Sequence, residues 1–214
     1  MKKTLVTIAT LFACQTGYAS SWYVGLGLGA VRANDASENI AAGDSTLAQL
    51  GIGTITSYDD NSGALSLLGG YRFTAHIAAE LDYNSLGSYD MYGFAGPGPT
   101  PPSGRERNEA DALSLAAVLT APLNNFVSLH GKLGPTLASN EAWTCTSNFW
   151  WCDHASDTKL GSIVGAGASF TLPRLIGAFR LEADRFGNVG DAHNEFTAGS
   201  FSVLQFQYVF TFAN

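Results

Sequence analysis

The protein has 214 residues, of which 46% are hydrophobic and 14% are charged, and its formal net charge is −7. This composition excludes a disordered chain, which needs few apolar residues and many charges, and the acidic balance excludes a nucleic-acid binder, which needs a basic face. No run of about 18 apolar residues is present, so we expect no membrane-spanning helix. Two classes remain: a soluble all-β domain, and an outer-membrane β-barrel, whose strands give weak sequence signals.

Residues 1–19 are typical of a secretory signal peptide. Two lysines precede an apolar run, and small residues at the −3 and −1 positions indicate cleavage after Ala19. Lipoprotein processing at Cys14 is the alternative, but Phe12 stands where that motif expects a small residue. We favour cleavage after Ala19, which leaves residues 20–214 as a single exported domain.

Eight segments alternate between apolar and polar residues with the two-residue period of a β-strand. They span residues 22–31, 64–73, 77–86, 112–123, 126–136, 160–172, 176–185 and 201–212. Each has about ten residues, which is enough for a tilted strand to cross the hydrocarbon of a membrane. The polar parity carries Arg, Lys, Glu and Asp at mid-strand, which the dry core of a soluble sandwich would not accept unpaired.

The connections between these segments alternate in length. Residues 74–76, 124–125 and 173–175 form short connections, whereas the long ones span about 33–63, 87–110, 138–158 and 187–200. Long outer loops and short periplasmic turns are typical of outer-membrane barrels. We therefore predict an all-β fold: an eight-stranded, antiparallel, up-and-down transmembrane β-barrel with both termini in the periplasm.

Aromatic residues on the outward parity are expected to form a girdle at the periplasmic rim. They are Trp22, Tyr71, Phe73, Phe170, Phe210 and Phe212.

Two cysteines, Cys145 and Cys152, remain once the signal peptide is removed. Because an exported protein meets an oxidising compartment, a disulfide between them is favoured. A metal site is the rival interpretation, but two cysteines alone provide too few ligands. We expect neither a metal nor a cofactor.

Several stretches resemble the OmpA-like transmembrane domain, a family of eight-stranded outer-membrane barrels. They are WYVG at 22–25, GGYRF at 69–73, AELDYNSLG at 79–87, KLG at 132–134 and RLEADRFGNVGD at 180–191. The closing Phe210-Thr211-Phe212 is similar to the C-terminal signal that the barrel-insertion machinery reads. The resemblance implies a location in the outer membrane of a Gram-negative bacterium and a structural or surface-interaction role. The peptidoglycan-binding domain of longer members is not expected, because the chain ends with the last segment.

The polar parity faces the lumen, which in an eight-stranded barrel is just wide enough for side chains to fill. Buried charges need partners, so we predict a paired lumen network. Its members are Arg72, Glu80, Asp82, Lys132, Arg180, Glu182 and Asp184. The third and seventh segments face each other, so Glu80 and Arg180 should meet near mid-height. Inward glycines such as Gly27 and Gly165 should leave room for water. We interpret the network as a structural plug with at most a narrow, porin-like pore; the resemblance favours the alternative, a gate.

Two features at the outer end are candidate contact sites. Phe149, Trp150 and Trp151 lie between the two cysteines and either pack against neighbouring loops or bind a host or phage partner. Arg32 and Arg185 take the outward parity at the extracellular ends of the first and seventh segments. Because guanidinium groups bind phosphate in a bidentate way, they predict a lipopolysaccharide contact. Two solvated arginines above the acyl chains are the alternative.

A lipid A modifying enzyme, either an acyl hydrolase or a transferase, is the alternative function. His154 with Ser156 and Asp157 offers one set of groups, and His193 with Asp191 offers another. Neither set lies in a catalytic motif, and a lipid-processing site would need an outward Ser–His pair near the rim, which the pattern lacks. We therefore expect a barrel without enzymatic activity.

Overall fold

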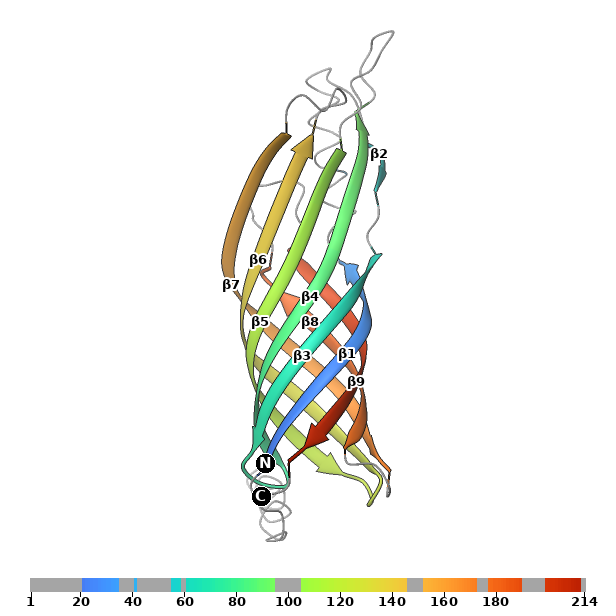
Figure 1. Ribbon diagram of the computed structural model, residues 1–214, viewed down its shortest axis with the longest axis vertical. Coiled ribbons are helices and arrows are strands. Elements are labelled where there is room, and N and C mark those ends of the chain that lie inside the picture. Colours follow the sequence, from blue (N-terminus) through green and yellow to red (C-terminus); the bar gives the residue numbers. More distant parts are fainter. Residues whose placement is uncertain are drawn as a thin grey trace, which may run out of the picture.

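The computed structural model describes residues 21–34, 41, 55–58, 61–94, 105–145, 152–172, 177–189 and 199–212. Within these ranges, no helix is long and apolar enough to cross a membrane. The described residues are almost entirely β-strand and form a tall cylinder of tilted strands (Figure 1). The predicted signal peptide, with both of its processing sites, lies outside the described residues.

The wall of the cylinder is one continuous antiparallel sheet. Its strands are β1 (Ser21–Ala33), β2 (Ile55–Tyr58), β3 (Asn61–Arg72), β4 (Ile77–Phe94), β5 (Arg105–Pro122), β6 (Val127–Cys145), β7 (Cys152–Thr171), β8 (Ala178–Gly187) and β9 (Ser200–Thr211). They are hydrogen-bonded in the order β2-β4-β3-β1-β9-β8-β7-β6-β5, and pairing of β4 with β5 closes the sheet. The short β2 pairs with the part of β4 that extends beyond β3, so the closed wall has eight strands. The predicted eight-stranded antiparallel barrel is confirmed.

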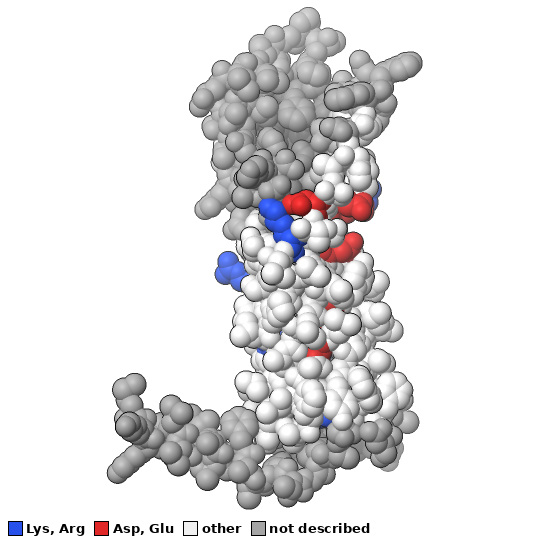
Figure 2. Space-filling view, turned by 90° about the vertical axis from the view of Figure 1, so that its left-hand side faces the viewer, with Lys and Arg blue, Asp and Glu red and all other residues white. Residues whose placement is uncertain are grey.

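The alternation of the sequence separates the two faces of this wall. Along β1, Leu26 and Leu28 point outward and are 65% and 68% exposed, whereas Tyr23 points inward and is 1% exposed. A soluble protein of this size would rarely leave so many large apolar side chains in contact with water. The lower part of the surface is accordingly almost free of charge in Figure 2, and charged side chains gather in a band near the upper end of the described residues. This arrangement fits a barrel whose outer face is covered by lipid.

Tight turns close the lower end of the barrel. The Asn124 side chain accepts hydrogen bonds from the backbone N–H groups of Phe126 and Val127, at 2.8 and 2.9 Å. Thr74 Oγ1 does the same for His76 and Ile77 in the turn between β3 and β4. A side-chain oxygen that satisfies the N–H groups two and three residues ahead fixes a short reversal of the chain. β1 begins and β9 ends at this same end, as predicted for the periplasmic side (Figure 1).

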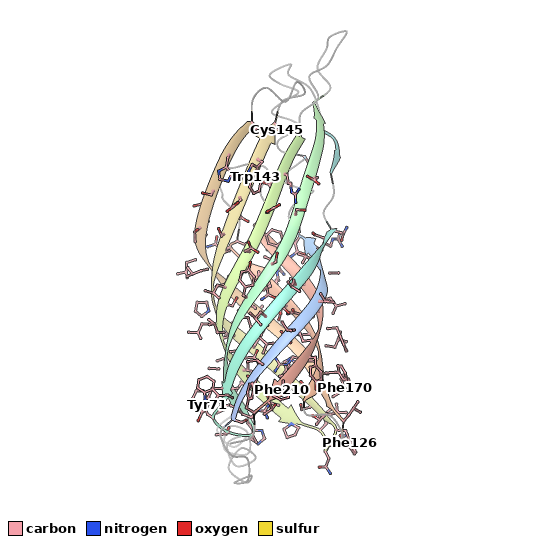
Figure 3. All side chains as sticks on the ribbon, in the orientation of Figure 1. Tyr71, Phe126, Trp143, Cys145, Phe170 and Phe210 are labelled. Atoms are coloured by element: carbon pink, nitrogen blue, oxygen red, sulfur yellow. A yellow bond between two sulfur atoms is a disulfide. The ribbon has the colours of Figure 1, made fainter. Side chains whose placement is uncertain are left out.

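An aromatic belt surrounds this lower end, where Figure 3 labels Tyr71, Phe126, Phe170 and Phe210. The ring of Tyr71 lies 4.8 Å from that of Trp22 and 5.0 Å from that of Phe73. Aromatic rings of this kind concentrate where a membrane meets water. The girdle therefore marks one membrane–water interface, at the end of the barrel that the short turns close.

The four middle strands are longer than the sequence pattern predicted. Residues 87–110 and 138–158 were expected to be loops. Instead, β4 continues to Phe94 and β5 already begins at Arg105, and likewise β6 continues to Cys145 and β7 begins at Cys152. Period-two alternation disappears there because neither face lies against lipid, so both faces accept polar residues. Figure 1 shows these strands rising above β1, β3, β8 and β9.

A β-bulge marks the transition into the β4 extension. The register between β4 and β5 shifts between Ser85 and Ser88, and Gly87 between them has φ +77°. A residue with a Cβ is strained in this left-handed region. The backbone N–H of Ser88 donates to Ser62 Oγ at 3.1 Å, which ties the bulge to β3.

Candidate functional site: a layered lumen and a charged outer rim

The middle of the lumen contains charged side chains from strands on opposite sides of the barrel. Arg180 on β8 donates to Glu80 on β4 at 2.8 Å and lies 3.5 Å from Glu182. The hydroxyl of Tyr23 on β1 donates to the same oxygen of Glu80 at 2.8 Å. Glu80 is 1% exposed, so this pair is enclosed by protein. The structure thus places Glu80 and Arg180 in contact across the lumen, as their inward parity predicts.

Lys132 on β6 is the second centre of the network. Its ammonium group lies 3.2 Å from Asp82 and 2.9 Å from Asp184, and it donates a hydrogen bond to Glu182. Glu182 also accepts from its other side, where His130 Nε2 lies 2.7 Å from Oε2. Glu182 therefore contacts both permanent cations, Lys132 and Arg180, and links the two centres.

Acceptors outnumber donors in this layer. Four carboxylates face two permanent cations among the buried residues, and Gln205 adds donor bonds to Asp184 at 2.5 Å and to Glu182 at 3.4 Å. One oxygen on each of several buried groups has no hydrogen-bond partner: Glu80 Oε2, Asp82 Oδ1, Asp184 Oδ1, Gln205 Oε1 and Gln207 Oε1. Carboxyl groups therefore outnumber the permanent cations in this layer, and its stability depends strongly on those two cations.

The inward glycines do not widen the lumen as predicted. A Cβ on Gly27 would come 2.6 Å from Gln207 Cγ, and one on Gly165 would come 1.9 Å from Asp184 Oδ1. Side chains of neighbouring strands thus occupy the space beside these glycines. The glycines allow the polar layer to pack closely, and the expectation that they leave room for water is wrong at these positions.

Apolar layers lie above and below the charged one. Leu86, Ile163, Phe186 and Phe201 belong to a buried cluster at the outer end of the lumen, and the first three are 0% exposed. A smaller buried cluster at the periplasmic end contains Tyr23, Leu68, Ala78, Val118 and Val209. Ions cross an apolar constriction with difficulty because it strips them of water. With the charged layer between them, these two apolar layers make three stacked layers inside the lumen, and each apolar layer opposes the passage of ions.

The sequence analysis did not predict these apolar layers. Their residues continue the inward parity of the charged positions, as Phe186 continues Glu182 and Asp184 along β8. Inward parity, regardless of charge, is the sequence signal for these apolar residues. The same parity identifies Tyr23 and Gln205 as members of the polar layer.

Arg72 departs from its predicted place in the network. It is half-buried at the end of β3, and its guanidinium lies over the ring of Tyr23, 5.6 Å from the ring centroid. This cation–π contact replaces the carboxylate partner that was expected. The reason is height: β3 ends at Arg72, below the carboxylates of β4 and β8.

The upper hairpin of β6 and β7 contains the disulfide. Cys145 and Cys152 are bonded, with their Cα atoms 4.3 Å apart. Below the bond, the rings of Trp143 and His154 are 5.1 Å apart, and His154 Nε2 lies 3.8 Å from Glu141. Figure 3 labels Trp143 and Cys145 on this hairpin, far above the aromatic girdle. Phe149, Trp150 and Trp151, the predicted partner-binding residues, lie outside the described residues.

The outer rim has two sides of opposite charge. Arg32 and Arg185 are exposed, and each is the register partner of Ser202, which lies between them on β9. On the other side, Glu109 on β5 is paired with Glu141 on β6, and Arg107 contacts Glu109 at 2.7 Å.

Among the described residues, one set resembles a hydrolase triad in its order of contacts. Ser169 Oγ lies 3.4 Å from His130 Nδ1, and His130 Nε2 lies 2.7 Å from Glu182. All three take the inward parity, so the barrel wall separates the hydroxyl from the acyl chains of the membrane. Glu182 is also paired with Lys132 and Arg180. Ser169, His130 and Glu182 are therefore part of the buried hydrogen-bond and ion-pair network of the lumen. Of the two sets proposed from the sequence, His154, Ser156 and Asp157 are exposed on the upper part of β7, with Asp157 on the opposite face of the strand from the other two, and His193 with Asp191 lies outside the described residues.

Comparisons with known proteins found both similar solved structures and a matching family model. The chain resembles Ail of Yersinia pestis, solved with the heparin analogue sucrose octasulfate, at 16% identity over 90% of this chain and 97% of that chain, with a TM-score of 0.47. It resembles Neisserial surface protein A at 12% identity over 91% of this chain and 100% of that chain, with a TM-score of 0.48. It resembles OprG of Pseudomonas aeruginosa at 11% identity over 92% of this chain and 97% of that chain, with a TM-score of 0.49. The search of curated proteins finds no match. The family model of the OmpA-like transmembrane domain matches residues 18–214. The chain therefore belongs to the OmpA-like transmembrane domain family and is a β-barrel of the bacterial outer membrane.

Proposed function

We propose that this protein is a structural and surface-interaction component of the outer membrane and that its lumen supports at most a narrow, charge-plugged pore. The observation that carries the proposal is the stacking of an apolar layer, a charged layer and a second apolar layer inside one closed wall. An eight-stranded barrel has little interior beyond its own side chains. Function is then concentrated on the outer surface and at the extracellular end.

The charge of the extracellular end limits the partners that it can bind. On the upper hairpins Glu141 and Asp157 are exposed and Glu109 is half-buried, and Arg107 and Lys159 are paired with neighbouring carboxylates. An acidic surface attracts cationic partners and repels polyanions. We therefore expect a cationic or neutral host or phage partner, unlike the sulfated ligand in the Ail structure. The residues between Cys145 and Cys152, with their three aromatic side chains, are the proposed contact segment.

A deletion strain separates this role from lipid A modification. Lipid A is extracted from the parent, the deletion strain and a complemented strain, and its acyl chains are counted by mass spectrometry. We expect identical acylation in all three, together with a greater uptake of a hydrophobic dye when the barrel is absent. Acylation that changes on deletion and returns on complementation would establish the enzymatic alternative and refute our proposal.

A further inference from the structure

Two arginines lie in one register row just above the lipid-facing surface. Arg32 on β1 and Arg185 on β8 are both partners of Ser202 on β9, so their Cα atoms are two strand spacings apart, about 10 Å. Both side chains are exposed and point out of the barrel. The outward residues that precede them toward the periplasm, Ala30 and Ala183, are apolar. The arginines are therefore the first charges above the hydrocarbon on this side, at the height of lipid headgroups.

The wall directly below the arginines is hollowed. In the outward row two residues nearer the periplasmic end of each strand, the side chains are mostly small. In the outward row two residues further along, they are mostly bulky. The small row is Gly63, Ala30, Leu204, Ala183 and Ala166, and the bulky row contains Leu65, Leu28, Phe206 and Leu181. A shallow, open hollow results on the outer surface, lined by Ala30, Ala166, Ala183 and Leu204 together with both arginines.

We propose that this hollow binds a phosphorylated, acylated glycolipid of the outer leaflet, with a phosphate between Arg32 and Arg185 and an acyl chain against Ala166 and Ala183. Guanidinium groups bind phosphate oxygens in bidentate geometry, and two of them about 10 Å apart can reach one phosphate from both sides. The small side chains give the acyl chain a recess in a surface that is otherwise studded with leucine and phenylalanine. The phosphate binds at the head of the hollow and the chain lies along its floor.

The distribution of charge around the rim favours binding of a phosphate headgroup on the side of Arg32 and Arg185. Across the wall, the same height carries Asp111, with Glu109 and Glu141 just above it. Those carboxylates repel a phosphate headgroup, whereas the arginine side attracts it. A general attraction of lipid to the apolar belt would show no such preference, so the asymmetry makes the site specific.

The test measures retention of a defined probe, hexa-acylated lipid A with two phosphates, on the refolded full-length barrel in detergent by native mass spectrometry. The charge variant is Arg32→Gln with Arg185→Gln, and the groove-filling variant is Ala166→Leu with Ala183→Leu. The matched controls are Arg107→Gln, on the acidic side, and Ala117→Leu, an exposed alanine on β5. All of the substituted side chains are exposed and point out of the barrel, and a gel-shift assay with and without heating verifies that each variant is folded.

We expect the charge variant to bind the probe at least about tenfold more weakly, because hydrogen bonds between charged groups are lost. The groove-filling variant should also bind more weakly, and both controls should match the wild type. Lipid A stripped of its phosphates should bind like the charge variant. Equal binding of the probe by the charge variant and the wild type would overturn the proposal. Displacement of the probe by millimolar inorganic phosphate would also overturn it, because the site would then bind a free anion rather than a lipid.

Discussion

Replacing Lys132 by methionine is the most severe single change that the lumen network predicts. Lys132 is 3% exposed and contacts three carboxylates, those of Asp82, Glu182 and Asp184. Methionine keeps most of the side-chain volume and removes the charge, which leaves four buried carboxylates around Arg180 as the one permanent cation of the layer. Breaking a buried ion pair costs about 3–5 kcal/mol, because the remaining charge has no compensation. We expect the free energy of unfolding to fall by at least that amount.

Urea unfolding of the refolded barrel in detergent, followed by tryptophan fluorescence, measures this loss. With a slope of about 2 kcal/mol per molar urea, a loss of 4 kcal/mol moves the midpoint down by about 2 M. Lys159→Met is the control, because the half-buried Lys159 pairs with the exposed Asp157 at 3.7 Å in the upper hairpin, and a salt bridge in contact with water contributes at most about 1 kcal/mol. Adding Asp184→Asn to the Lys132→Met variant should restore part of the loss. Equal midpoints for the two lysine variants would refute the reasoning, since the network would then contribute no more than a surface pair.

Further predictions concern topology and the outer hairpin. In intact cells, a membrane-impermeant maleimide should label a cysteine introduced at Glu141 and not one at Asn124, because the two lie at opposite ends of the barrel; labelling of the turn alone would invert the orientation. Cys145 and Cys152 should react with thiol reagents only after reduction, and serine at both should lower the urea midpoint by at most about 1–1.5 M, since a loop this short contributes at most roughly 2–3 kcal/mol; free thiols in the protein purified without reductant would contradict the disulfide. Tyr23→Phe should destabilise the barrel by about 1.5–3 kcal/mol in the same urea assay, because Glu80 loses a hydrogen-bond donor; a midpoint equal to that of the wild type would contradict it.

The fold could be predicted because lipid outside and polar contacts inside impose opposite preferences on alternate residues. That contrast identified all eight membrane strands and the inward position of Glu80, Lys132 and Arg180. The up-and-down order then placed the third and seventh segments opposite each other, which is why contact between Glu80 and Arg180 could be foreseen. Parity and strand order are properties of the chain alone, so no coordinates were needed for them.

Height and side-chain reach were beyond such reasoning. Parity states which face a residue takes but not which partner its side chain can reach, so Arg72 was assigned to the network although it lies over Tyr23. The upper halves of β4 to β7 were missed because the contrast between lipid and lumen ends above the membrane. The hollow below Arg32 and Arg185 depends on the register of five neighbouring strands, which the sequence of any one strand does not contain.

Single-channel recording in a planar bilayer tests most directly the claim that stacked layers close the lumen. The comparison is between the wild type and a variant with Glu80→Ala and Phe186→Ala, which opens the charged layer and the upper apolar layer together. Phe206→Ala is the control, because that ring faces the membrane and is 54% exposed. We predict at most a small conductance for the wild type and the control, and a larger, cation-preferring current for the double variant, because carboxylates remain in the lumen. A steady conductance of the size expected for a water-filled pore in the wild type would contradict the account, and so would indistinguishable current traces from all three proteins.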